Sequence, residues 1–189
     1  MSTKIRCTWC ESSQLYKNYH DHEWGKPVYD DAVFFEFLVL ETFQAGLSWI
    51  TILNKRENFR KAFDNFDYKK IANYNDDKIL DLLQDAGIIR NKLKVYSAVT
   101  NAQNFMKIQD EFGSFSEYIW SFVDHEAIVN YPKKHADVQA TTPLSDEISK
   151  NLKKRGFKFV GSTVVYAFLQ ATGIVNDHVI DCFLKGFGE

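Results

Sequence analysis

Cysteine and long hydrophobic runs are scarce in this chain of 189 residues. No apolar stretch approaches the ~20 residues of a membrane span, and the N-terminal segment MSTKIRCTWC lacks the apolar core of a signal peptide. We therefore expect a cytoplasmic protein with no membrane partner. Three cysteines, an odd number in a reducing compartment, argue against a disulfide framework and leave metal binding or simple burial.

An excess of positive charge is also missing. The net charge of −2 gives no general sign of a nucleic-acid partner, because lysine and arginine dominate phosphate binding. The charge is unevenly placed, however, since the stretch from Lys150 to Lys158 holds five basic residues and no acidic one. Low-complexity segments, repeats and flexible linkers are absent as well, so we expect one folded unit over residues 1–189.

Alternating strand patterns are nearly absent, and apolar residues recur at helical spacing between glycines. The sequence therefore predicts an all-α fold. The expected helices begin with capping or charged residues and end near glycine. They run from Asp30 or Asp31 to about Gln44, from Ser48, from Asp76 or Asp77 to Gly87, from Asn91, from Ser114, from Thr142 to Gly156, from Ser162 to Gly173, and over a last segment at 175–182.

One candidate metal site combines the two ends of the chain. His178 and Cys182 are four residues apart, which puts them on one face of the expected last helix. A structural zinc takes four Cys or His ligands, and further candidates cluster near the N-terminus: Cys7, Cys10, His20 and His22. Such a zinc would join the two termini and leave no open position for water. The alternatives are ordinary buried cysteines and histidines, or a redox CxxC pair at residues 7–10.

Residues 34–50, FFEFLVLETFQAGLSWI, place a carboxylate in a nearly all-apolar helix. Glu41 falls on the face of Phe34, Phe37 and Leu38, where a charge is costly unless it is paired. A buried acid near several aromatic residues is what a pocket for a flat heteroaromatic ligand needs. The other reading is a buried glutamate that accepts hydrogen bonds from the backbone or a tyrosine.

The break between two helices at residues 85–94, DAGIIRNKLK, is a sharp hairpin. Amide groups of such a turn and of the following helix N-terminus can bind a phosphate without reading sequence. A plain connection between helices explains the same spacing.

These stretches together resemble the DNA-3-methyladenine glycosylase I family of the helix-hairpin-helix superfamily. The resemblance covers almost the whole chain, from Cys7 to Cys182. Its motifs are RCTW at 6–9, YHDHEWG at 19–25, QAGLSWITIL at 44–53, QDAGIIRNK at 84–92, WSFV at 120–123, KKRGFKFVG at 153–161 and VNDHV at 175–179. It implies a helix-hairpin-helix glycosylase of two helical lobes, with the hairpin lobe at roughly 50–130.

The resemblance also implies roles for individual residues. The structural zinc would be held by Cys7, His20, His178 and Cys182, although spacing also allows Cys10 in place of His20, and a cysteine at position 10 departs from the family pattern. Glu41 and Tyr19 would be the catalytic residues, with Trp49 and Trp9 stacking on the base. DNA contacts would come from Leu47, Gly87, Ile88, Arg90, Lys154, Arg155 and Lys158.

Two further departures concern the pocket and the hairpin. Thr42 and Phe43 replace the short polar residues expected after Glu41, which affects the fine shape of the pocket. The hairpin lacks the second glycine of the commonest superfamily version.

The implied activity is hydrolysis of the N-glycosidic bond of 3-methyladenine in alkylated double-stranded DNA, without strand cleavage, by a monomer. The implied product is the free base. Two other classes remain open: a non-catalytic zinc-stabilised DNA-binding module, and a zinc-dependent hydrolase such as a deaminase, which needs an open metal position.

Overall fold

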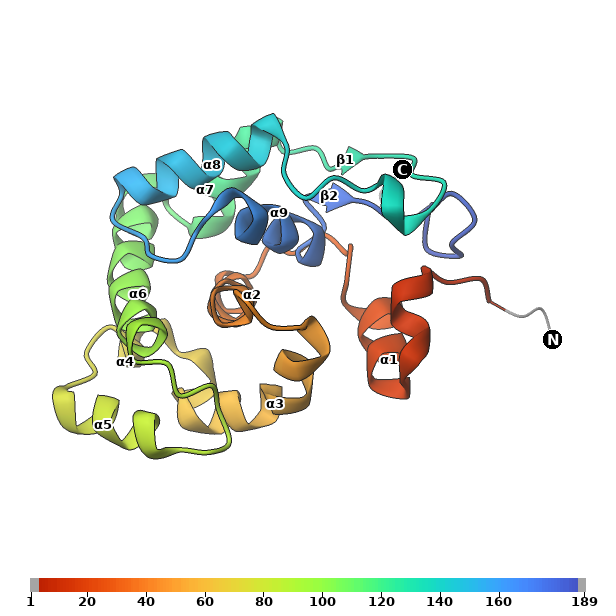
Figure 1. Ribbon diagram of the computed structural model, residues 1–189. Coiled ribbons are helices and arrows are strands. Elements are labelled where there is room, and N and C mark those ends of the chain that lie inside the picture. Colours follow the sequence, from red (N-terminus) through yellow and green to blue (C-terminus); the bar gives the residue numbers. More distant parts are fainter. Residues whose placement is uncertain (1–3, 187–189) are drawn as a thin grey trace.

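The computed structural model describes residues 4–186, most of which are helical. Short 3-10 turns join the α-helices, and the two-residue strands β1 (Ile128–Val129) and β2 (Val175–Asn176) pair in parallel. Figure 1 shows the arrangement of the α-helices. They are α1 (Gln14–His22), α2 (Asp31–Gln44), α3 (Trp49–Ala62), α4 (Tyr68–Ile71), α5 (Asp76–Gln84), α6 (Lys92–Phe112), α7 (Phe115–Trp120), α8 (Pro143–Lys154) and α9 (Ser162–Ala171).

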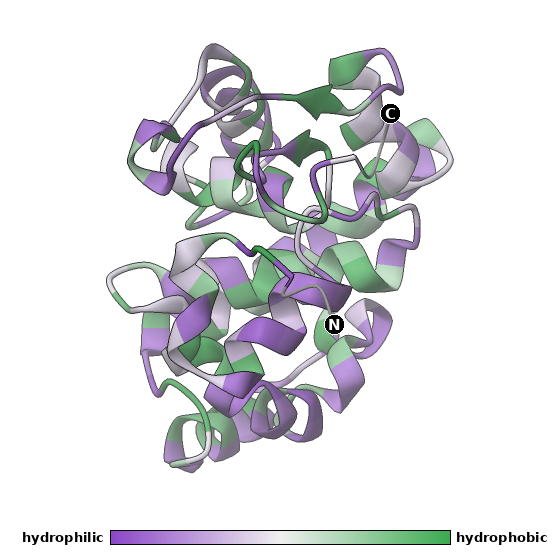
Figure 2. Ribbon diagram, turned by 90° about the vertical axis from the view of Figure 1, so that its right-hand side faces the viewer, coloured by the Kyte–Doolittle hydropathy of each residue, from purple (hydrophilic) through white to green (hydrophobic). Residues whose placement is uncertain are grey.

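Helix α2 forms the centre of the molecule, where Figure 1 shows it end-on with α3, α6 and α9 around it. Every residue from Phe37 to Phe43 is buried, as expected for a helix that is apolar on nearly all sides. The core is aromatic: Phe35 and Phe115 both pack against Phe105 of α6. Outer helices have a hydrophobic and a hydrophilic side in Figure 2. A mainly helical fold is therefore confirmed.

The expected helix starts agree with the structure at most positions. Asp30, Asn91 and Thr142 each cap a helix with a side-chain oxygen that accepts a backbone N–H. For α5 the predicted start at Asp76 is confirmed, with Asn75 as the cap before it. The predicted end at Gly87 was wrong, because the helix ends at Gln84.

The predicted last helix at 175–182 is also wrong. The chain forms β2 there and continues without helical structure, because tertiary hydrogen bonds take its backbone groups. The Ile180 N–H donates to the Pro132 carbonyl, and the Phe183 N–H donates to the Ile5 carbonyl. This second bond brings the two ends of the described chain together. Each helix within residues 4–186 is too short or too polar to cross a membrane.

Candidate active site and metal centre

A cavity of about 260 Å³ lies between α1, α2, α3 and α9 and the loop at residues 130–142. Glu41, Tyr19, Trp49 and Trp9, the four residues assigned to the base pocket, all line it. The structure therefore brings these four together. Sequence reasoning missed the other lining residues, which are Tyr16, Trp24, Gln44, His135, Val138, Ala167 and Gln170.

Glu41 is the unusual residue of this cavity. Its side chain is only 3% exposed, and the buried Oε2 has no hydrogen-bond partner. Burial raises the pKa of this carboxyl to about 8, because an apolar environment disfavours the charged form. A buried acceptor without a partner is costly, so the site is suited to a ligand that brings N–H donors.

Two further polar groups in the cavity lack partners. The Trp49 Nε1–H is buried and donates no hydrogen bond. The Tyr19 hydroxyl makes none within residues 4–186, and burial, together with the nearby Glu41 carboxylate, raises the pKa of the phenol. Tyr19 therefore remains protonated at neutral pH. The cavity offers a donor at Trp49, an acceptor at Glu41 and a hydroxyl at Tyr19.

The walls of the cavity are aromatic. Tyr19 packs against Trp49 with ring centroids 5.5 Å apart, and Trp9 lies edge-on to Tyr16 at 5.2 Å and to Trp24 at 5.1 Å. Tyr16 and Trp24 come from the N-terminal third of the chain, which also supplies Trp9, Tyr19 and Trp49. Gln170 comes from a helix far along the chain, and no local sequence signal points to it.

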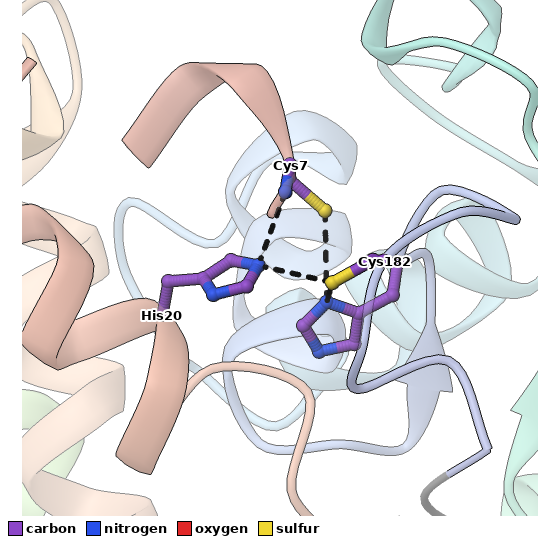
Figure 3. Close-up of side chains that lie close together, drawn as sticks. Cys7, His20 and Cys182 are labelled. Atoms are coloured by element: carbon purple, nitrogen blue, oxygen red, sulfur yellow. Dashed lines mark hydrogen bonds between the residues drawn. The ribbon is translucent and has the colours of Figure 1, made fainter. Parts of the chain in front are cut away.

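The four predicted metal ligands form one buried cluster, of which Figure 3 labels Cys7, His20 and Cys182. The ligand atoms of Cys7, His20, His178 and Cys182 lie within 4.8 Å of one another. The Cys182 Sγ is 3.4 Å from the His178 Nδ1 and 3.5 Å from the His20 Nε2. Ligands around a tetrahedral zinc are separated by about 3.3–3.8 Å. The donor set and its spacing therefore fit a metal ion.

Outer hydrogen bonds orient both histidines toward the cluster. The His20 Nδ1 lies 2.9 Å from the Asp21 carboxylate, which Arg6 holds in a bidentate ion pair. The His178 Nε2 lies 3.3 Å from the Trp24 carbonyl. Each imidazole thus uses one nitrogen for a protein acceptor and leaves the other for a metal, as metal-binding histidines do.

Cys10 is not a member of the cluster. Its thiol is buried and donates to the Cys7 carbonyl at 3.1 Å. Of the two ligand sets that the sequence allowed, the structure assembles the one with His20. Within the cluster, hydrogen bonds from Cys7 and the two histidines lower the pKa of Cys182, which favours the thiolate that a metal requires.

The hairpin at residues 87–91 joins α5 to α6. The Gly87 N–H donates to the Asp85 carboxylate, and Ile88 is buried, so neither offers a free group to solvent. The backbone amides of Ile89 and Arg90 donate no hydrogen bond within the described residues. Arg90 itself is exposed. The hairpin therefore has free amides close to the N-terminus of α6, which is an arrangement that binds anions.

Leu47 lies at the turn between α2 and α3 and is 41% exposed. Gly46 before it has a φ of +84°, so the sharp turn needs glycine. In the basic stretch at residues 150–158, Lys154 and Lys158 are exposed. Arg155 is already paired, because its guanidinium contacts the Glu111 carboxylate through both terminal nitrogens.

The buried acid, its unpaired neighbours and the aromatic walls form a cavity in a helical protein that is suited to a flat, nitrogen-rich ring. The methyladenine glycosylase family model matches residues 9–185. The chain belongs to this family. It is 46% identical over 177 residues to DNA-3-methyladenine glycosylase 1 of Escherichia coli, which covers 94% of this chain and 95% of that protein.

Solved structures agree with the sequence relatives. A tyrosine-to-phenylalanine variant of 3-methyladenine DNA glycosylase I in complex with 3-methyladenine matches with a TM-score of 0.94 and 35% identity, over 97% of this chain and 99% of that one. The 3-methyladenine DNA glycosylase I of Staphylococcus aureus matches with a TM-score of 0.92 and 37% identity, over 95% and 96%.

Proposed function

We propose that this protein is a monofunctional DNA glycosylase of base excision repair that releases 3-methyladenine from alkylated double-stranded DNA. The observation that carries the proposal is the unpaired Glu41 carboxyl in an aromatic cavity. Curated relatives of nearly the same length carry the name DNA-3-methyladenine glycosylase.

The cavity residues have distinct roles in base binding. Glu41 accepts a hydrogen bond from the amino edge of the base, which supplies the partner that the carboxyl lacks. Trp49 and Trp9 stack on the ring, and cation–π attraction favours the positively charged lesion. Tyr19 fixes the base through its hydroxyl. A neutral, undamaged adenine offers no charge to the aromatic walls and therefore binds less tightly.

The chemistry requires little from the protein because the lesion is already activated. Methylation at N3 makes the base cationic and weakens its bond to C1′ of deoxyribose. When this bond breaks, the electron pair stays with the base, which leaves as neutral 3-methyladenine. Water supplies the new hydroxyl on C1′ and releases its second proton to the solvent. Extruding a damaged nucleotide from the duplex costs less than extruding a paired one, so damage itself contributes to selectivity.

Three surfaces position the DNA. Leu47 enters the gap left by the extruded nucleotide, as apolar wedges do in other DNA complexes. The hairpin lobe, roughly 50–130, binds the phosphate backbone through the hairpin at residues 87–91, chiefly by the free backbone amides of Ile89 and Arg90. The basic loop formed by Lys154, Arg155 and Lys158 adds positive charge, with Arg155 held in place by Glu111. The enzyme acts as a monomer.

Zinc is the metal that the cluster fits best. Two thiolates and two imidazoles are a common structural zinc set, and four protein ligands complete the tetrahedron. Cys7, His20, His178 and Cys182 would hold the ion, which ties the N-terminal segment to the C-terminal one. A deaminase-type zinc needs a position for water, which this donor set does not offer. The ion is therefore structural.

Abasic-site formation on methylated duplex DNA tests the proposal. The protein should leave alkali-labile abasic sites and no direct strand breaks, and Glu41→Gln should lower their rate of formation by at least tenfold. Equal rates for both proteins would contradict the role of Glu41. DNA binding without abasic sites would instead indicate a non-catalytic, zinc-stabilised module.

A further inference from the structure

A second buried carboxylate lies beside the base cavity. Asp177, directly after β2, is 3% exposed and lines a neighbouring cavity that shares Val138 with the first. Its Oδ2 accepts hydrogen bonds from the Tyr166 hydroxyl at 2.6 Å and from the Gln170 Nε2 at 2.7 Å. Its Oδ1 accepts one from the Asn130 Nδ2 at 2.8 Å. Asp177 thus accepts hydrogen bonds from three neutral donors.

These bonds fix the orientation of the Gln170 side chain. Gln170 belongs to α9 and lines the base cavity. A carboxylate only accepts hydrogen bonds, so the amide nitrogen of Gln170 must face Asp177. The Gly25 N–H donates to the backbone carbonyl of Gln170 and holds this residue in place. The side-chain Oε1 accepts no hydrogen bond within residues 4–186, so it is the free acceptor of a residue that lines the base cavity.

We propose that Gln170 is a specificity-determining residue whose Oε1 accepts a hydrogen bond from the bound base, and that Asp177 is the positioning residue that sets its amide. This inference rests on the proposed glycosylase function. Glu41 from α2 and Gln170 from α9 then give the cavity two acceptors. Adenine bears an amino donor where guanine bears the O6 acceptor, so the site selects N3-methylated 6-aminopurines over 6-oxopurines.

An amide reversal follows if Asp177 is replaced by asparagine. The new side chain can donate an N–H to the Gln170 Oε1, after which the Gln170 Nε2 faces the cavity. The donor would then disfavour an amino group and favour the guanine O6. Removing Tyr166 O–H leaves the bond between Gln170 and Asp177 intact, so Tyr166→Phe is the matched control.

The test measures binding of 3-methyladenine and 3-methylguanine by tryptophan fluorescence, with thermal unfolding as the check on folding. We expect Gln170→Leu and Asp177→Asn each to weaken 3-methyladenine binding about tenfold, the effect of one hydrogen bond. Asp177→Asn should also reduce the preference for 3-methyladenine over 3-methylguanine, whereas Tyr166→Phe should leave that preference unchanged. The double variant should bind 3-methyladenine no more weakly than Gln170→Leu.

Wild-type affinity in Gln170→Leu would overturn the inference and leave the proposed function intact. A further tenfold loss on adding Asp177→Asn to Gln170→Leu would show that Asp177 acts by another route and would overturn its positioning role. Failure of the wild-type protein to bind 3-methyladenine would instead overturn the proposed function, and this inference with it.

Discussion

At the scale of single residues, burial without a partner is the property that separates Glu41 from the other acids of residues 4–186. Its carboxyl accepts no hydrogen bond from residues 4–186, and burial raises its pKa to about 8. The protein thus keeps an energetically unfavourable group in its core. Functional sites often hold groups that cost stability, and a ligand that pairs with Glu41 recovers that cost.

The stability of the Glu41→Gln variant should therefore depend on pH. An unfolded glutamate titrates near ~4.3, so between there and pH 8 the folded state retains a proton that the unfolded state releases. Wild-type stability falls over this interval, and the variant lacks the effect. The free energy of unfolding of Glu41→Gln should exceed that of the wild type by little at pH 4. The difference should rise toward pH 8, to at most about 5 kcal/mol.

Urea unfolding at several pH values measures this difference. Glu147→Gln, which changes an exposed glutamate on α8, is the control and should show no such rise. A constant difference between Glu41→Gln and wild type from pH 4 to pH 8 would contradict a buried, protonated Glu41.

A second residue-scale prediction concerns Gly25. Its φ is +76°, and a Cβ added there would lie 2.8 Å from the His178 Nε2. Gly25→Ala should therefore displace His178 and weaken metal binding, measured as faster zinc loss to a chelator. Gly113→Ala is the matched control, because its φ is also positive and no atom lies within 4 Å of the added Cβ. Equal zinc retention in the two variants would contradict the contact.

At the scale of elements, Lys94 links the hairpin to the turn that carries Leu47. Lys94 lies in the first turn of α6, and its Nζ donates to the carbonyls of Phe43 at 2.8 Å and Ala45 at 2.7 Å. These are C-terminal carbonyls of α2 that have no partner within the helix. Burial lowers the pKa of Lys94, because desolvation disfavours the charged ammonium. The two hydrogen bonds offset this cost and stabilise the buried cation.

Lys94→Met should destabilise the protein by about 1–3 kcal/mol, because it leaves both carbonyls without a donor. The turn with Leu47 should loosen, so excision from duplex DNA should slow more than binding of free 3-methyladenine weakens. Thermal unfolding and the two activities measure this, with Lys61→Met, at an exposed site on α3, as control. Equal effects on excision from duplex DNA and on binding of free 3-methyladenine would argue against a link between the hairpin and Leu47.

Most helices could be predicted because their signals are local. Apolar spacing and caps such as Asp30, Asn91 and Thr142 lie within a few residues of the boundary that they set. The stretch at 175–182 differs, because pairing with β1 and bonds to Ile5 and Pro132 decide its path. His178 and Cys182 nevertheless meet, through a turn and not a helix.

The site was predictable only in part for the same reason. Glu41 is conspicuous in an apolar helix, and the metal ligands belong to unusual motifs. Gln170 and Lys94 carry no local signal, since each acquires its role from a partner distant in sequence. Polar residues of this kind are assigned only once the tertiary contacts are known.

At the scale of the whole molecule, the cluster of two cysteines and two histidines brings together segments near the two ends of the described chain, where order is otherwise weakest. Cys7 and His20 come from the N-terminal segment, and His178 and Cys182 come from the C-terminal one. Since binding to the folded state adds stability, zinc removal should lower the melting temperature and expose the cysteine thiols.

Cys182→Ser should therefore reduce zinc content to well below one ion per protein and lower the melting temperature by several degrees. Cys10→Ser, a matched change at a buried cysteine outside the cluster, should keep one zinc. Metal analysis and thermal unfolding measure both. Loss of zinc in Cys10→Ser with retention in Cys182→Ser would contradict the assigned ligands.

The central claim is that the cavity around Glu41 holds the base that the protein releases. Incubation of the wild type and Glu41→Gln with duplex DNA carrying labelled methyl groups, followed by chromatography of the released bases, tests it directly. The account predicts labelled 3-methyladenine from the wild type and at least tenfold less from the variant. No released base from the wild type, or equal amounts from both proteins, would contradict it.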